Sequence, residues 1–293
     1  MNKKKKTSST AIAWLMPLGT IVQFILPRFL AVKIALLAGR IAFRINSRQR
    51  LRLIENYRHI FGPEAPKKLL IQTARQAFEN MAVFYADLLR VPVIKKRAAF
   101  IGELNRKEFD LVLSRGRGAI LVTGHIGNWD LAGVFLTALG YPLSAVVEPV
   151  PGGWMKTFNR YRKALAMETI PIPERHRLIS ALEKHRVIAL VADRDLTNRG
   201  VLCPAFDAYR SFPKGPAAYS LRYNIPIVIG YFIRQHKRNR PPYRGVISPP
   251  IEFNPTGEID LDIVFLTQII ADKLNQIIKQ YPDQWLVFNA SWK

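Results

Sequence analysis

Two residues that could perform acid–base chemistry, His125 and Asp130, follow a short apolar stretch of the chain. That stretch, residues 119–123, is rich in β-branched side chains and lies between two glycines, as is typical of a strand buried on both faces. Asn128 is a favourable N-cap for an apolar helix over 129–139. The pattern predicts that His125 lies in the loop at the carboxyl end of a strand, with Asp130 in the first helical turn. An imidazole held by a carboxylate at one ring nitrogen can act as a base through the other.

The same spacing of histidine and acid occurs once more, at His59 and Glu64. This second pair follows a helical pattern over 51–57 and runs through Gly62-Pro63, which indicates a helix end with no strand before it. We therefore expect the chemistry at His125. A loop histidine that is merely satisfied by a nearby carboxylate is the alternative interpretation.

A second charged cluster, Asp193-Arg194-Asp195, follows an apolar stretch at 187–192 that also has the pattern of a strand. An arginine between two acids could bind a phosphate group or a developing oxyanion, with Asp195 orienting it. A structural ion-pair loop is the alternative, because such networks are common in proteins.

Several segments, in this order, resemble those of the bacterial lipid A biosynthesis acyltransferases and the related phosphatidylinositol mannoside acyltransferases, within the lysophospholipid acyltransferase superfamily. Residues 124–130 are similar to the family's His-x4-(Asp/Glu) motif, and the Asp-Arg-Asp form of 193–195 is closer to the mannoside branch. The resemblance covers about residues 45–290. The other similar segments are 50–61, 76–92, 212–217 and 225–228.

This resemblance implies an enzyme that transfers a fatty acyl chain from an acyl thioester, either acyl-CoA or acyl carrier protein, to a hydroxyl of a lipid or glycolipid. It implies His125 as the general base and Asp130 as the acid that orients the imidazole and stabilises the imidazolium. The family has an arginine in the region of Arg160 and Arg162, and Arg162 resembles it more closely; a solvated helix face is the alternative interpretation of either arginine. No cofactor or metal is implied. The predicted substrate-binding residues are Arg162, Asp193, Arg194 and Asp195.

The chain departs from the family pattern at residues 202–207, which read Leu-Cys-Pro-Ala-Phe-Asp. A Phe-Phe-Gly-like element is usual there, and some members carry a nearby acid that supports the catalytic site. The third member of the catalytic apparatus is therefore not predicted. A catalytically inactive, lipid-binding member of the same fold is the competing hypothesis that this departure favours.

Apolar stretches alternate with helical patterns along the chain, which predicts an α/β sheet covered by helices. The resemblance implies that this central sheet is mixed and similar to that of the glycerolipid acyltransferases. A long helix is expected over 67–89, and a closing amphipathic helix over 261–280. The expected strands are 119–123, 143–148, 187–192, 226–233, 245–251 and 285–288, and the other expected helices are 129–139, 154–167, 176–185 and 213–223.

The first 60 residues contain twelve lysines and arginines and a single acid, Glu55, and supply nearly half of the net charge of +23. The apolar run 11–27 is short for a membrane span and has cationic residues on both sides. We predict that residues 1–44 form membrane-associating helices that lie in the interface and bind anionic headgroups, and that 45–293 form the catalytic domain. A single N-terminal span is the alternative.

Composition excludes several other classes of protein. The single cysteine, Cys203, excludes an intrachain disulfide and fits a reducing compartment. Neither a metal-ligand spacing nor a nucleotide-binding glycine motif is present, and no nucleic-acid-binding module accompanies the basic charge. Because acyl thioesters are made in the cytosol, we expect the protein on the cytoplasmic face of the bacterial plasma (inner) membrane. A soluble acyltransferase for small molecules is a third hypothesis, against which the apolar segment 11–43 weighs.

Overall fold

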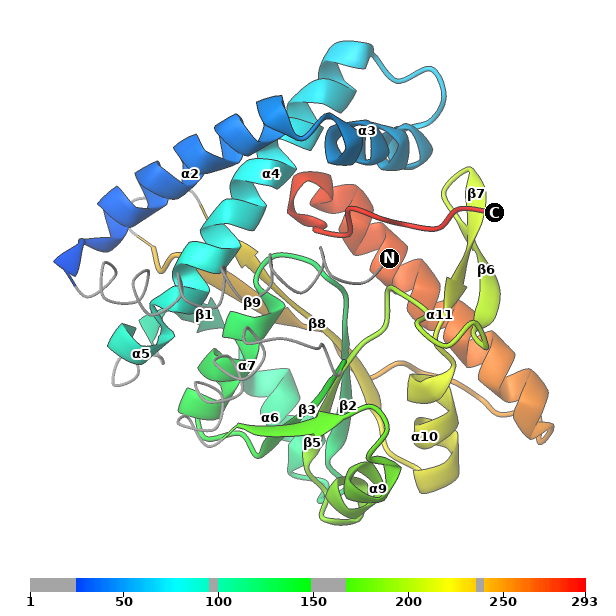
Figure 1. Cartoon of the computed structure of the whole chain (residues 1–293). Helices are drawn as coiled ribbons and strands as arrows, with labels where there is room; N and C mark the ends of the chain where they lie inside the picture. Colours follow the sequence, from blue (N-terminus) through cyan, green and yellow to red (C-terminus); the bar gives the residue numbers. More distant parts are fainter. Residues whose placement is uncertain (1–24, 95–99, 149–166, 236–239) are drawn as a thin grey trace, which may run out of the picture.

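A seven-stranded sheet forms the centre of the protein in a computed structural model that describes residues 25–94, 100–148, 167–235 and 240–293. Its strand order is β1-β9-β8-β2-β5-β3-β4, and neighbouring strands are parallel except for β8 and β9. Figure 1 shows the sheet below the N-terminal helices drawn in blue and cyan, and the predicted mixed α/β architecture is confirmed. The strands are β1 (Gly102–Leu104), β2 (Ala119–Thr123), β3 (Leu143–Val147), β4 (Glu168–Pro171), β5 (Val187–Val191), β8 (Ile227–Arg234) and β9 (Tyr243–Ile247).

Helices cover both faces of the sheet, because successive side chains of its strands point to opposite faces. On β2, Ala119 and Leu121 pack with α6 (Lys107–Leu113) and α7 (Trp129–Ala138). Ile120 and Val122 pack with helices on the other side. These helices are α9 (Arg175–Glu183), α10 (Gly215–Tyr223) and α11 (Ile259–Gln280).

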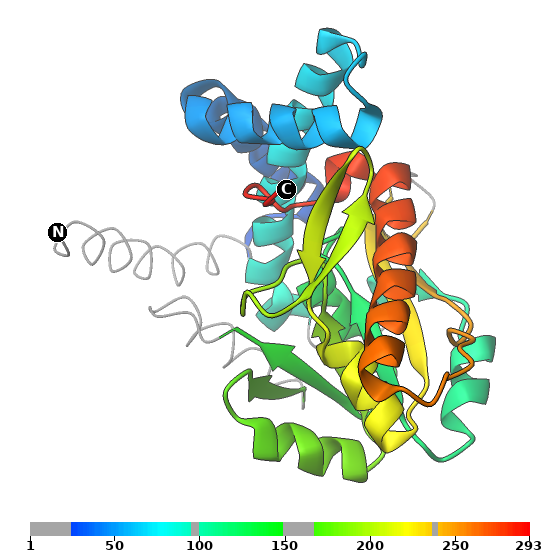
Figure 2. The same cartoon turned by 90° about the vertical axis from the view of Figure 1, so that its right-hand side faces the viewer.

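The strand and helix patterns in the sequence located most of these elements, including β2, α4 and α11. Two short strands, β1 and β4, and the antiparallel hairpin of β6 (Val201–Ala205) and β7 (Ala208–Phe212) were not predicted. The hairpin forms a separate two-stranded sheet next to α11 (Figure 2). The expected strand 285–288 is instead one isolated bridge between Trp285 and Ile126. The expected helix 154–167 lies almost entirely outside the described residues.

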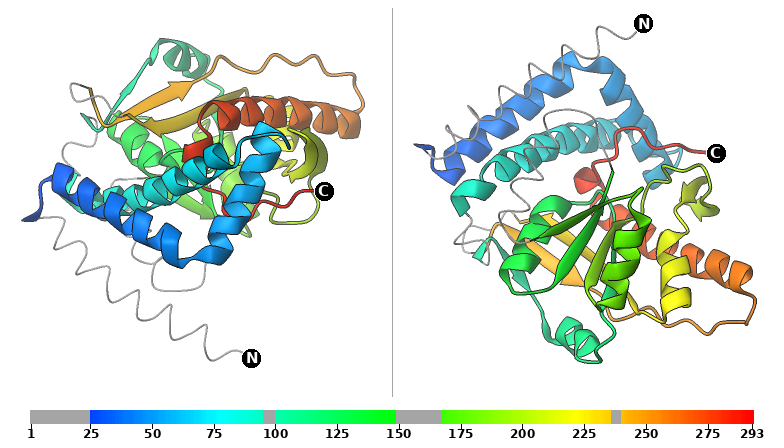
Figure 3. Two further views of the ribbon diagram at one scale, coloured as in Figure 1. Left: turned by 90° about the horizontal axis from the view of Figure 1, so that it is seen from above. Right: turned by 60° about the horizontal axis from the view of Figure 1, so that its bottom comes forward.

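In the described part of the chain, the sheet is preceded by α2 (Arg28–Ile45), α3 (Ser47–Phe61), α4 (Lys67–Leu89) and the short α5 (Val91–Ile94). Helices α2 and α4 run side by side (Figure 3), and the small residues Ala31, Ala35 and Gly39 form the buried seam of α2. The predicted boundary after residue 44 falls one residue before the end of α2. No helix in the described ranges is long and apolar enough to cross a membrane.

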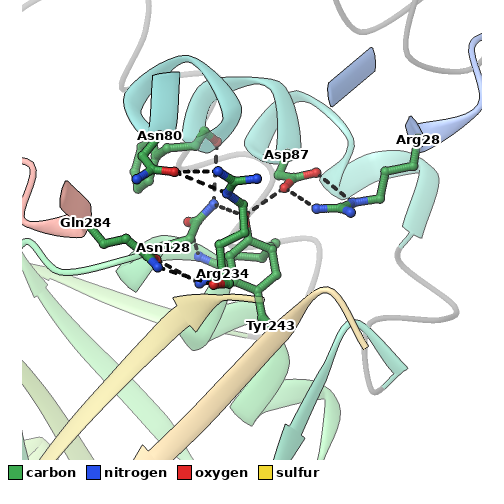
Figure 4. A network of polar contacts seen from close by, with 9 residues as sticks. Arg28, Asn80, Asp87, Asn128, Arg234, Tyr243 and Gln284 are labelled. Atoms are coloured by element: carbon green, nitrogen blue, oxygen red, sulfur yellow. Dashed lines mark hydrogen bonds and ion pairs between the residues drawn. The ribbon is translucent and has the colours of Figure 1, made fainter. Parts of the chain in front are cut away.

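A polar network ties these helices to the sheet (Figure 4). The buried carboxylate of Asp87 on α4 accepts hydrogen bonds of 3.0 and 2.7 Å from the Arg28 guanidinium of α2. It also accepts one of 2.7 Å from the hydroxyl of Tyr243 on β9. Arg234 of β8 donates to Asn80 of α4 at 2.6 Å. Because the Asp87 carboxylate is buried and fully bonded, α2 belongs structurally to the body of the protein.

Candidate active site

His125 follows β2 directly, in a loop that is held by backbone hydrogen bonds on both sides. The Leu286 amide donates to the His125 carbonyl, and the Gly127 amide donates to the Gln284 carbonyl, both at 2.8 Å. Gly127 has a φ of +65°, and a Cβ atom there would lie 2.1 Å from the Phe232 carbonyl oxygen. Only glycine fits this position, so the turn between β2 and α7 depends on it.

The predicted N-cap of α7 is confirmed, because the side chain of Asn128 accepts a hydrogen bond of 3.0 Å from the Leu131 amide. The Asn128 amide group also lies 3.5 Å from the Tyr243 hydroxyl, at the edge of the polar network described above. The loop that carries His125 is therefore fixed at both ends.

The carboxylate that contacts the imidazole ring is that of Asp193, at the carboxyl end of β5. Its Oδ1 lies 2.7 Å from His125 Nδ1, and its Oδ2 accepts a hydrogen bond of 2.8 Å from the His125 backbone amide. Asp193 is completely buried, which by itself raises the pKa of its carboxyl. His125 and the nearby guanidinium of Arg210 outweigh burial and lower that pKa to about 2.

This ionisation state of Asp193 determines the tautomer of His125. An ionised carboxylate can only accept hydrogen bonds, so Nδ1 of the ring carries the proton that it shares with Asp193. The lone pair of a neutral imidazole then lies on Nε2. His125 is thus set up as a base through Nε2.

Asp130 lies in the first turn of α7 and lines the same cavity as His125. The sequence pattern predicted that Asp130 holds the imidazole, whereas the carboxylate at Nδ1 is that of Asp193. Burial raises the pKa of Tyr85 on α4, and the negative charge of Asp130 raises it further. Trp129 packs edge-on against the imidazole, with ring centroids 4.8 Å apart.

Within the described residues, neither Asp193 nor Asp195 forms a hydrogen bond or an ion pair with the side chain of Arg194, which lies between them in the sequence. The Asp195 carboxylate accepts hydrogen bonds of 2.8 Å from Thr197, Gly200 and Ser211, and it organises the loop that leads into β6. Arg194 is exposed and lines the cavity. Arg162 lies outside the described residues.

A single large cavity of about 1380 Å³ adjoins His125, well above the size of most ligand sites. One part of its wall is apolar and lies between the sheet and α7, where it includes Leu121, Phe135, Leu136 and Phe232. The part formed by α9, α10 and the 193–200 loop carries five exposed cations. They are Arg175, Arg194, Arg199, Lys214 and Arg222.

Two residues of the site were missed by the sequence analysis, Trp285 and Arg210. The indole of Trp285 donates a hydrogen bond of 2.9 Å to Asp193 Oδ2. The guanidinium of Arg210 donates one of 2.5 Å to the Asp193 carbonyl oxygen. No sequence motif surrounds Trp285 or Arg210, so nothing beyond their residue types indicated a role in the site. Among the described residues no group of three histidine, cysteine or acidic side chains could hold a metal ion.

His125 thus lies at a strand end, contacts the buried acid Asp193 and faces a cavity with a long apolar wall. The chain belongs to the bacterial lipid A biosynthesis acyltransferase family, whose model matches residues 1–293. This confirms the resemblance seen in the ordered sequence segments, and the protein is accordingly an acyltransferase.

Two similar relatives are phosphatidylinositol mannoside acyltransferases. The one from Mycobacterium tuberculosis (strain ATCC 25618 / H37Rv) is 27% identical over 305 residues, which cover 99% of this chain and 91% of the relative. The one from Mycolicibacterium smegmatis is 31% identical over 188 residues, 61% of this chain and 58% of the relative.

Proposed function

We propose that the protein transfers a fatty acyl chain from an acyl thioester to a hydroxyl group of a lipid or glycolipid acceptor, with His125 as the general base. The observation that carries this proposal is the Nδ1 contact to an ionised, buried Asp193, which leaves Nε2 as the basic nitrogen. A general base of this kind accelerates a reaction by roughly 10²- to 10⁴-fold.

In the proposed reaction, Nε2 of His125 takes the proton of the acceptor hydroxyl as its oxygen attacks the thioester carbonyl carbon. The new C–O bond forms, the C–S bond breaks, and the imidazolium returns its proton to the leaving thiolate. The products are an ester and a free thiol. Direct transfer fits the state of Cys203, because this residue is buried and its pKa is raised to about 11, first by burial and then by the charge of Asp272.

The two parts of the cavity wall match the two parts of such a donor. The apolar wall between the sheet and α7 suits the acyl chain, because burying a methylene group contributes about 0.8 kcal/mol. The five cations suit the phosphate on the pantetheine arm, which coenzyme A and acyl carrier protein have in common. No cofactor other than the donor itself is required.

We further propose that α2 holds the enzyme on the cytoplasmic face of the bacterial plasma membrane, where lipid acceptors and cytosolic donors meet. The outer side of α2 presents Leu30, Ile34, Leu37, Ile41 and Ile45, which are between 36% and 77% exposed. Lys33, Arg40 and Arg44 are exposed beside this apolar stripe. An apolar stripe next to cations is the pattern of a helix that lies in the interface of an anionic bilayer.

The reaction is tested with purified protein, a bacterial lipid extract and either palmitoyl-CoA or palmitoyl acyl carrier protein, with mass spectrometry of the lipids. We expect one acceptor to gain one acyl chain with wild-type protein and none with the His125→Ala variant. Absence of acylated product with both donors would contradict the proposed reaction. The preferred donor is the one with the higher kcat/KM.

Membrane binding is tested by sedimentation with anionic phosphatidylglycerol vesicles. The double variant Ile34→Glu/Leu37→Glu should bind at least about 10-fold more weakly, because each leucine or isoleucine contributes roughly 1.5–3 kcal/mol when buried. Leu261→Glu on α11 is the matched control, since Leu261 is 53% exposed and Ile34 and Leu37 are each 57% exposed. Equal loss of binding in the control would show that α2 is not the membrane-binding face.

A further inference from the structure

Two buried residues, Trp285 and Arg210, donate hydrogen bonds to Asp193 of the His125–Asp193 pair. Neither the sequence motifs nor the proposed reaction assigns them a role. Trp285 is completely buried, and its indole N–H is 2.9 Å from the same Asp193 oxygen that accepts from the His125 backbone amide. Arg210 is 2% exposed and donates to the Asp193 carbonyl oxygen. Asp193 is therefore held by Trp285 and Arg210 in addition to His125.

The guanidinium of Arg210 is held by aromatic rings rather than by an acid. Its central carbon lies 4.8 Å from the ring centroid of Trp285, 5.2 Å from that of Trp292 and 5.3 Å from that of Phe212. One of its nitrogens, Nη1, is buried with no hydrogen-bond partner among the described residues. A buried cation without a counter-charge costs free energy. Here the negative charge of Asp193 offsets part of that cost for Arg210. Burial lowers the pKa of Arg210 to about 10 although Asp193 raises it.

Trp285 is itself placed by the loop that carries the base. It forms an antiparallel bridge with Ile126, and the hydrogen bonds of Gln284 and Leu286 to that loop lie on either side of it. A Cβ atom at Gly124 would lie 3.2 Å from Asp193 Oδ2, so the absence of a side chain there leaves room for the carboxylate. The backbone thus fixes both the donor and the acceptor of the indole hydrogen bond.

We propose that Trp285 and Arg210 are positioning residues that hold Asp193 in one orientation and keep it ionised, and thereby fix the tautomer of His125. The proposal rests on the proposed role of His125 as the base. Trp285 supplies a directional hydrogen bond, and Arg210 supplies the counter-charge and the backbone anchor. Loss of either residue removes one interaction that stabilises the ionised carboxylate of Asp193 and therefore favours protonation of that carboxylate.

The main test compares Trp285→Phe with Trp292→Phe. Both variants remove one indole N–H from the same aromatic cluster, but that of Trp292 donates to Asn56 at 2.9 Å and makes no contact with Asp193. Trp285→Phe should lower kcat/KM by roughly 10- to 100-fold, as expected for one hydrogen bond to a charged group. It should also shift the acid limb of the pH–rate profile to higher pH, because a carboxylate that loses a donor protonates more easily. Trp292→Phe keeps an aromatic ring beside Arg210 and loses no hydrogen bond to Asp193, so its effect on kcat/KM should be at least about 10-fold smaller, without a shift of the acid limb.

A double-variant cycle separates positioning from a general structural effect. In an Asp193→Asn background, Trp285→Phe should cause no further loss, because the group on which it acts is already gone. Arg210→Met should show the same dependence on Asp193, and Arg210→Lys should partly restore the acid limb because it keeps the charge. If the Arg210 variants do not fold, the Trp285 cycle alone decides. A full loss from Trp285→Phe in the Asp193→Asn background would overturn the proposal.

A readout that needs no activity keeps this test separate from that of the reaction. In protein labelled with ¹⁵N-histidine, the Nδ1–H signal of His125 is identified by its absence in His125→Ala. We expect Trp285→Phe to change this signal and its titration, and Trp292→Phe to leave them as in the wild type. An unchanged signal in Trp285→Phe would refute the positioning role even if the enzyme transfers acyl chains. An inactive wild type with the expected changes would refute only the reaction.

Discussion

Two histidine–aspartate pairs in the described part of the molecule have nearly the same local geometry. His125 Nδ1 lies 2.7 Å from Asp193, and His59 Nδ1 lies 2.6 Å from Asp207 in the turn between β6 and β7. The two imidazoles are also equally exposed, at 24% and 23%. Neither the distance nor the exposure of the histidine therefore distinguishes a base from a surface contact.

The acids distinguish the two pairs. The side chain of Asp193 is fully buried and receives hydrogen bonds from the backbone of His125 and from Trp285, whereas that of Asp207 is 37% exposed. His59 stacks on Trp292 at 4.4 Å and has a second acid, Glu55, at 3.9 Å. His125 instead lines the large cavity. The proposed catalytic pair therefore differs from the surface pair in the burial of its acid and in the cavity that its histidine lines.

The largest expected difference between the pairs is in turnover. His125→Ala should lower kcat/KM by roughly 10²- to 10⁴-fold, because it removes the base, and His59→Ala should leave it nearly unchanged. Steady-state kinetics on both variants, with circular dichroism to verify folding, measure this difference. Comparable inactivation by His59→Ala in a folded protein would show that the wrong pair was chosen.

Replacement of the acids sharpens the comparison. Asp193→Asn removes the acceptor that holds Nδ1–H, so we expect a loss of about 10²- to 10⁴-fold in kcat, the scale of general-base catalysis itself. Asp130→Asn should leave the tautomer of His125 unchanged in ¹⁵N NMR, whatever its effect on turnover. The opposite pattern, in which Asp130→Asn changes the tautomer and Asp193→Asn does not, would return the orienting role to Asp130.

A smaller effect is expected on stability in acid. The pKa of Asp193 is lowered in the folded state to about 2 from an ordinary value of 3.8. Its contribution is fully present above about pH 4 and is lost as the pH falls toward 2, because the unfolded state binds the proton first. The shift corresponds to about 2 kcal/mol. Urea unfolding between pH 2 and 5 should therefore be less pH-dependent in Asp193→Asn than in the wild type, and an equal slope would contradict this.

The smallest effect is expected at the second pair. Asp207→Asn should change the free energy of unfolding at pH 7 by less than about 1 kcal/mol, because exposed ion pairs contribute little. Urea unfolding at low and high salt provides the measurement. A loss above about 2 kcal/mol would mean that the His59–Asp207 pair stabilises the folded state about as much as a buried ion pair does.

The sequence predicted the position of the site better than its internal contacts. Periodicity and capping located β2, α7 and Asn128, since these depend on neighbouring residues. In both histidine–acid motifs, the acid five residues after the histidine is not the partner of Nδ1. The partner of His125 is Asp193, 68 residues away in the sequence, and that of His59 is Asp207, 148 residues away. Such partners depend on how the strands and the hairpin pack, and spacing along the chain carries no information about that.

The same limit explains the elements that were missed. Strand β1 has three residues and β4 has four, too few to show a period. The hairpin of β6 and β7 contains Pro204, which argues against a strand in a sequence but fits a two-stranded edge. Trp285 was expected in a strand, yet only its bridge to Ile126 forms.

The indole contact of Asp193 also bears on how the enzyme is synthesised. Trp285 lies 92 residues after Asp193, close to the carboxyl terminus. At about 5–20 residues per second, a ribosome needs about 5 to 18 s to reach Trp285 after it has added Asp193. During that interval the nascent chain carries the histidine and its acid without the residue that completes their surroundings. A chain that ended before Trp285 would therefore contain every residue of the acyltransferase motifs and lack the indole contact that we propose fixes the orientation of Asp193.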